Sequence, residues 1–288
     1  FATNVIGGAA LGPQIYVRDL WTNTTHVGTG EVPANAEDAS ISADGQLVAF
    51  ISNSEVLVYD RSLDSTVRIV DRAFSPMISA DGRFVTFYSG IAPRHAYLYE
   101  LATGISTVIS ATTGGAGTFC AHCSPSISDD GRYVAFEAAR SVPRTVRVFD
   151  RVTGAIEIVD GSTIGRSSLT VVRPEISGDG RTVFVYSYET GILDGYWLIA
   201  YDRTSGISTE VAFPVSSGES GASSSPLGDY VAFTSEAGLI ATDGNGYADV
   251  YLATLETNAP PVADPNGPYL FSLAAGPFDG RGSSDPEE

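Results

Sequence analysis

The sequence predicts an all-β repeat fold in which each repeat contains four strands. Three observations predict it: a hairpin pattern that recurs, a second strand pattern that recurs in step with it, and a nearly constant spacing. The hairpin is clearest in residues 124–136, SPSISDDGRYVAF, where alternating apolar residues flank an Asp-Gly pair. Asp-Gly between two alternating runs is a strong hairpin signal, because Gly adopts a positive φ without steric cost.

The hairpin pattern has four further copies along the chain. They are SISADGQLVAF (40–50), MISADGRFVTF (77–87), PEISGDGRTVFV (174–185) and SSSPLGDYVAF (223–233), the last with an altered turn. The turn glycines, Gly45, Gly82, Gly131, Gly180 and Gly228, are 37, 49, 49 and 48 residues apart. A spacing of this size is typical of repeat architectures, and two hairpins per repeat give four strands.

The second half of each repeat is another pair of alternating strands around a polar turn. It occurs as IYVRDLWTNTTHV (15–27), VLVYDRSLDSTVRIV (56–70), AYLYELATGISTVI (96–109), VRVFDRVTGAIEIV (146–159) and LIAYDRTSGISTEVA (198–212). A sixth start is DVYLATLE (249–256). Apolar residues at period two indicate strands with one buried face.

The combined pattern, S-x-S-x-D-G-x-x-V-A-F followed by x-V-Y-V-x-D-x-x-T-G, resembles the TolB-type propeller repeat, which also occurs in the propellers of prolyl oligopeptidases and the tricorn protease. The resemblance covers residues 1–256 and implies a β-propeller of four-stranded blades. Six starts of the second half against five complete hairpins predict six blades, with the first incomplete. Seven blades are the alternative.

Residues 257–288 do not contain the repeat pattern. Pro260-Pro261-Val262-Ala263, Gly267-Pro268-Tyr269 and Phe278-Asp279-Gly280 resemble the opening of a PKD domain. That immunoglobulin-like sandwich needs several more strands than this segment supplies. We therefore expect a linker and a truncated PKD-like remnant after the propeller.

The charge of the chain restricts the class of partner. Sixteen cationic side chains, all Arg, stand against 34 acidic ones, for a formal net charge of −18. Such a chain repels nucleic-acid phosphate and anionic lipid, so neither is an expected partner. No apolar run approaches the roughly 20 residues that span a bilayer.

The predicted location is extracellular or on the cell surface, after processing from a longer precursor. Phe1-Ala2-Thr3 resembles the close of a repeat hairpin, so the chain is expected to begin inside a strand. The relatives implied by the resemblance are exported proteins. In that compartment Cys120 and Cys123, in Cys-Ala-His-Cys, favour a local disulfide; redox chemistry and metal binding are the alternatives.

Residues 243–249, DGNGYAD, resemble the start of a calcium loop. Oxygen donors would come from Asp243, Asn245, Asp249 and the carbonyl of Tyr247. No bidentate Glu follows at the twelfth position, which is Thr254. The alternative is a polar turn whose side chains bond their own backbone.

No catalytic motif is present: the sequence has no G-x-S-x-G, no H-E-x-x-H and no phosphate-binding Gly-rich loop. The acids of the Asp-Gly turns are explained by hairpin geometry. We therefore expect a non-catalytic propeller that binds protein or glycan through its loops or its central funnel. The alternative is the propeller portion of a larger secreted hydrolase or polysaccharide-active enzyme.

Overall fold

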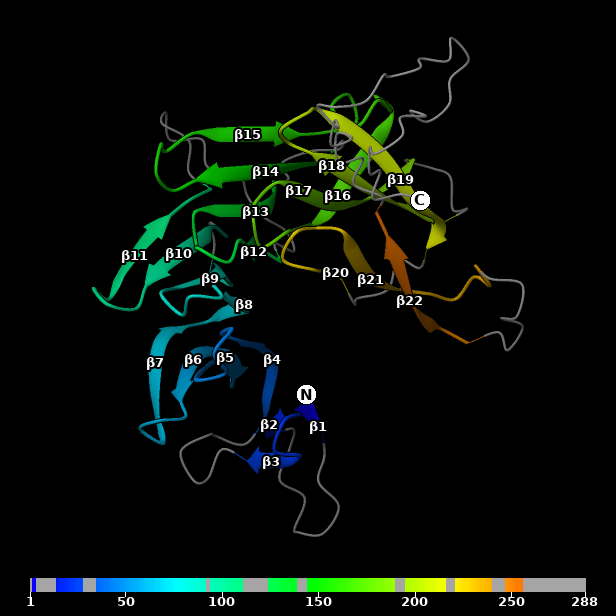
Figure 1. The fold of residues 1–288 in the computed structure, drawn as a ribbon. Helices are drawn as coiled ribbons and strands as arrows, with labels where there is room; N and C mark the ends of the chain where they lie inside the picture. Colours follow the sequence, from blue (N-terminus) through cyan, green and yellow to red (C-terminus); the bar gives the residue numbers. More distant parts are fainter. Residues whose placement is uncertain are drawn as a thin grey trace, which may run out of the picture. The chain divides into compact units, whose positions relative to one another are not determined.

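The computed structural model describes residues 2–3, 14–27, 35–91, 94–110, 124–138, 144–189, 195–215, 221–239 and 247–255. Every regular element in these ranges is a β-strand (Figure 1). Within them there is no helix of the length and hydropathy needed to cross a membrane. The chain divides into two compact units, Phe1–Ala253 and Thr254–Glu288. The predicted PKD-like segment, 257–288, lies outside the described residues.

Four sheets have four strands each, in which every strand is antiparallel to its neighbour along the chain. The first sheet contains β4 (Ala36–Ile41), β5 (Leu47–Ser52), β6 (Glu55–Asp60) and β7 (Ser65–Asp71). The second contains β8 (Ala73–Ile78), β9 (Phe84–Ser89), β10 (Ala96–Glu100) and β11 (Ile105–Val108). The third contains β12 (Ser126–Ile127), β13 (Tyr133–Ala138), β14 (Thr145–Asp150) and β15 (Ile156–Val159). The fourth contains β16 (Leu169–Ile176), β17 (Thr182–Glu189), β18 (Tyr196–Asp202) and β19 (Ile207–Val215).

Two further sheets have three strands among the described residues. One contains β20 (Ser223–Ser224), β21 (Tyr230–Ser235) and β22 (Asp249–Thr254), and the other β1 (Ala2–Thr3), β2 (Gln14–Asp19) and β3 (Thr24–Val27).

The structure is an all-β propeller with five blades, so the prediction of six blades is wrong, as is the alternative of seven. Blades one to four are the four-stranded sheets in chain order, and blade five is β20–β22. Each begins with the predicted Asp-Gly-type hairpin. The prediction of a sixth blade depends on the strand pair β2 and β3. β2 pairs with β3 and with the two-residue β1, and no Asp-Gly hairpin precedes them in residues 1–27. The number of second half-repeats is therefore larger than the number of blades.

The core lies between consecutive sheets, where alternate residues of each strand interlock. Between blades one and two, Val58, Val85 and Phe87 share one apolar cluster. Between blades three and four, Val148 and Val183 lie in another. The middle strands, such as β5, β13 and β17, are therefore buried on both faces, whereas the alternating pattern predicts one buried face, because each blade packs between two neighbours.

The hairpin turns are held by a serine at the end of the first strand of each blade. In blade three, Ser128 Oγ donates to Asp130 Oδ1 at 2.8 Å and accepts the backbone N–H of Tyr133 at 2.9 Å. The same pair of bonds recurs at Ser42, Ser79, Ser177 and Ser225. The altered turn of blade five keeps it by using Asp229 as the acceptor.

The five turns are linked to one another through the backbone. In each case a residue one or two positions after the turn serine donates its N–H to a carbonyl of the next turn. The bonds are Ala43 to Ala80 (2.9 Å), Asp81 to Asp129 (3.1 Å), Asp129 to Gly178 (2.8 Å) and Asp179 to Pro226 (2.8 Å). The first strands of successive blades therefore lie side by side, which brings β4, β8, β12, β16 and β20 into contact in that order.

Candidate functional site

In three of the five blades, the side chain two residues before the turn serine joins one inner strand to the next. Its oxygen accepts a backbone N–H of the following blade's inner strand. Ser40 Oγ accepts from Ile78 at 3.1 Å, Ser126 Oγ from Ile176 at 3.0 Å, and a carboxylate oxygen of Glu175 from Ser224 at 3.4 Å. The five residues at this position are Ser40, Met77, Ser126, Glu175 and Ser223. Glu175 is the only ionisable side chain among them.

Glu175 lies where the inner strands of three blades meet. Ser126 Oγ of blade three donates to its Oε2 at 2.8 Å. The N–H and hydroxyl of Ser224 in blade five approach its Oε1 at 3.4 Å. Burial raises the pKa of the Glu175 carboxyl to about 7, although the hydrogen bonds from Ser126 and Ser224 oppose that rise. Within the described part of the chain, no ion pair neutralises this carboxylate.

A β-bulge sets the direction of Glu175. The register of β16 against β17 shifts between Val172 and Glu175, where Arg173 has a φ of +51°. A bulge places an extra residue in one strand and re-aims the side chains beside it. After the shift, Glu175 pairs with Phe184, and before it Val172 pairs with Tyr186. Paired residues of an antiparallel ladder share a face, so Glu175 and Tyr186 lie on one face of blade four.

Tyr186 brings a second polar group to this face. The residue is 2% exposed, and its hydroxyl has no hydrogen-bond partner among the described residues. Burial raises the pKa of Tyr186 to about 12; the charge of Arg173 opposes this shift and that of Glu175 adds to it. We call Ser126, Arg173, Glu175, Tyr186 and Ser224 the Glu175 site.

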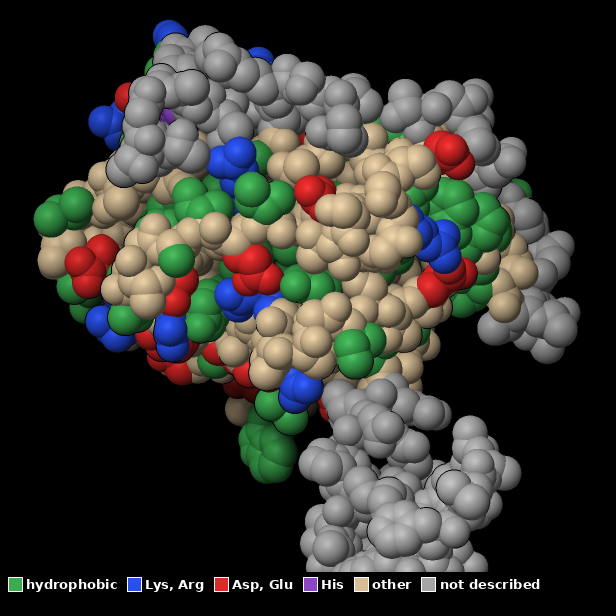
Figure 2. All heavy atoms as spheres, turned by 90° about the horizontal axis from the view of Figure 1, so that it is seen from above, with side chains coloured by type: hydrophobic (Ala, Val, Ile, Leu, Met, Phe, Trp, Pro, Cys, Tyr) green, Lys and Arg blue, Asp and Glu red, His purple; other side chains and the backbone are tan. Residues whose placement is uncertain are grey.

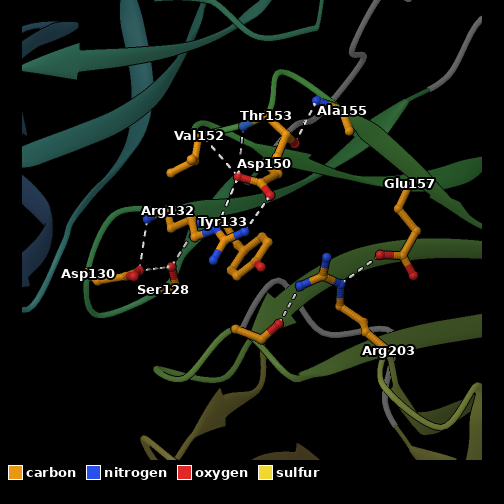
Figure 3. Close-up of polar contacts among 11 residues, drawn as sticks. Ser128, Asp130, Arg132, Tyr133, Asp150, Val152, Thr153, Ala155, Glu157 and Arg203 are labelled. Atoms are coloured by element: carbon orange, nitrogen blue, oxygen red, sulfur yellow. Dashed lines mark hydrogen bonds and ion pairs between the residues drawn. The ribbon is translucent and has the colours of Figure 1, made fainter.

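The turns that follow the inner strands, at the same strand ends as Glu175, carry a group of acidic side chains. Burial raises the pKa of the Asp129 carboxyl, and the charges of Asp130, Asp179 and Asp81 raise it further. The turn acids at this end are bound by their own serines and backbone N–H groups (Figure 3). Among the described residues, no three acidic, His or Cys side chains are arranged to hold a metal ion. Asp81, Asp130 and Asp179 therefore stabilise their own turns.

The residues predicted as sites from the sequence are only partly described. Asp243 and Asn245 lie outside the described residues, as do Cys120 and Cys123. Tyr247 is 76% exposed, and Asp249 is the first residue of β22. The calcium loop and the disulfide therefore stay predictions.

Sequence reasoning missed the Glu175 site. The signal was available once the five hairpins are aligned on their turn serines, because a carboxylate then stands at a position otherwise filled by Ser or Met. The partnerless hydroxyl of Tyr186 has no such signal, because a Tyr in an alternating strand is ordinary.

Comparison with known proteins supports the fold. No known family matches the sequence, and no curated protein does. Among solved structures, TolB from Acinetobacter baumannii matches at 16% identity and a TM-score of 0.61, over 85% of this chain and 60% of that one. A putative TolB from Agrobacterium tumefaciens matches at 18% identity and 0.58, over 85% of each chain. A prolyl endopeptidase matches at 16% identity and 0.55, over 85% of this chain and 38% of that one.

These matches confirm the TolB-like β-propeller, and at such identities they show the fold alone. The chain spans 60% of the length of the A. baumannii TolB. Nothing in them shows a PKD remnant.

Proposed function

We propose that the chain is a non-catalytic propeller of the cell envelope or the extracellular space that binds a protein partner at the Glu175 site. The observation that carries the proposal is the placement of Glu175. Its carboxyl is bonded from two neighbouring blades and is not neutralised by any described cation. The first strands of propeller blades surround the central channel, where ligands of propellers gain access.

A protein is the partner we propose because the fold is that of TolB. No described feature favours the glycan alternative. The likeness to a prolyl endopeptidase supports a second candidate, the propeller portion of a larger secreted hydrolase. In that case the same site would contact a peptide on its way to a catalytic domain.

To test the proposal, peptides that bind the immobilised protein are selected from a random library displayed on phage. The tightest selected peptide is synthesised, and its affinity is measured for the wild type and for Glu175→Gln. We expect the variant to bind about tenfold more weakly or worse, because a hydrogen bond to a charged group contributes about 1.5–3 kcal/mol.

The matched control is Asp71→Asn, which removes one negative charge from an exposed side chain at the end of β7. If the affinity for the peptide falls equally in both variants, the loss is caused by the change in net charge, and the proposal is contradicted. The peptide should also be recovered intact after long incubation. Its cleavage would contradict the non-catalytic assignment.

A further inference from the structure

We infer that the Glu175 site receives a basic side chain, a Lys ammonium or an Arg guanidinium, of the protein partner. The inference rests on the proposed function and names the chemistry that the site recognises. A carboxylate that is buried away from water is stabilised by an ion pair. Glu175 forms no ion pair in the described part of the chain, so a cation of the partner could pair with it.

No cation of the described residues is paired with Glu175. Seven arginines form the eight ion pairs found among the described residues, and none of these pairs includes Glu175. In the view of Figure 2, arginine and acidic side chains lie next to one another on the surface. Arg173 is close enough to lower the pKa of the Tyr186 hydroxyl, but among the described residues it forms no ion pair with Glu175.

The hydroxyl of Tyr186 supplies a second contact for the same ligand group. It is buried, it lacks a partner among the residues that the structure describes, and it lies on the face of blade four that carries Glu175. An unmatched buried hydroxyl costs about 1–3 kcal/mol, which a ligand N–H would recover by donating to it. Ammonium and guanidinium groups carry several N–H donors and no acceptor, so one such group serves both oxygens.

The charge of the whole chain acts in the same direction. A net charge of −18 attracts cationic partners and accelerates their encounter. Carboxylate ligands are repelled by the same field, and the hydrogen bonds that already reach Glu175 come from uncharged donors. The charge of the chain and the missing cation at Glu175 thus both favour a basic ligand group.

The test measures the pKa of Glu175 by carbon NMR of its carboxyl in protein labelled at Glu, with the signal assigned from the spectrum of Glu175→Gln. The probes are n-butylammonium, methylguanidinium, n-butanol and butyrate at equal concentration. A docked cation favours the ionised carboxyl, so either cationic probe should lower the pKa from about 7 by about one unit or more. Butanol should leave it unchanged.

An equal pKa in n-butylammonium and butanol would overturn the inference. A rise of the pKa with butyrate would also overturn it and would assign the site to anions. Tyr186→Phe tests the second contact, because loss of one hydrogen bond should weaken the ammonium effect about fivefold. An unchanged effect removes Tyr186 from the site.

The inference and the proposed function can fail separately. If Glu175→Gln abolishes peptide binding while no cation lowers the pKa of Glu175, the proposed function stands and the cationic ligand is wrong. If the cations bind while peptide affinity is unaffected by Glu175→Gln, the site is real but is not where the partner docks.

Discussion

Arg203 of blade four lies over the ring of Tyr133 in blade three, with its guanidinium carbon 4.2 Å from the ring centroid (Figure 3). The same guanidinium donates to Glu157 of blade three at 2.8 Å and to the carbonyl of Gly180 in its own blade. Arg151 repeats the arrangement one blade earlier, 4.4 Å from the ring centroid of Phe84. The Arg of the Asp-Arg pair that ends the third strand thus joins neighbouring blades.

Replacing Arg203 by Met should destabilise the propeller. The change keeps an apolar stem but removes the cation–π contact, the bond to Glu157 and the bond to Gly180. With only 15% of the Arg203 side chain exposed, we expect the free energy of unfolding in urea to fall by about 1–3 kcal/mol. The control is Arg68→Met, because that arginine is 57% exposed and its ion pairs contribute little. Equal losses in the two variants would show that Arg203 does not join the blades.

Two glycines separate steric crowding from backbone strain. Gly180 and Gly154 have nearly equal positive φ values, 73° and 71°. A Cβ at Gly180 would lie 2.3 Å from Cδ2 of Tyr133, whereas one at Gly154 would meet nothing within 4 Å. Both Ala variants should lose about 1 kcal/mol from strain, and Gly180→Ala should lose about 1–3 kcal/mol more from overpacking. Equal unfolding midpoints in urea would contradict the close packing of the turn on Tyr133.

The hairpins, their turns and the alternation of buried residues could all be predicted from the sequence, because local chemistry determines them. The serine that bonds each turn acid, for example, is four residues or fewer from its partner in every copy. The number of blades could not be predicted, because it depends on whether another part of the chain packs beside β2 and β3 as the inner hairpin of a sixth blade. The Glu175 site likewise depends on Ser126 and Ser224, each 49 residues away along the chain.

Glu175 should make stability depend on pH. The folded state raises its pKa from 4.5 to about 7, so between these values the native protein retains a proton that the unfolded chain has lost. Stability therefore decreases as the pH rises from 4.5 to 7, by an amount on the order of 1–3 kcal/mol. Urea unfolding from pH 4 to 8 measures it. In Glu175→Gln this decrease should be absent, and an unchanged pH profile in the variant would assign it to other groups.

The predicted calcium loop at 243–249 is tested by thermal unfolding. If Asp243, Asn245, Asp249 and the carbonyl of Tyr247 bind calcium, millimolar calcium should raise the unfolding midpoint relative to chelator, because a ligand that binds only the folded state stabilises it. Asp243→Ala should abolish that rise. A wild-type midpoint that is the same in calcium and in chelator would identify the segment as a polar turn.

The most direct test of the account is a methyl NMR titration of isoleucine-labelled protein with the phage-selected peptide. Ile127 and Ile176 lie on inner strands beside the Glu175 site and are 7% and 2% exposed, whereas Ile105 and Ile207 are on outer strands and are 60% and 62% exposed. Binding at the Glu175 site predicts that the signals of Ile127 and Ile176 move and those of Ile105 and Ile207 do not. Movement confined to Ile105 and Ile207 would contradict it.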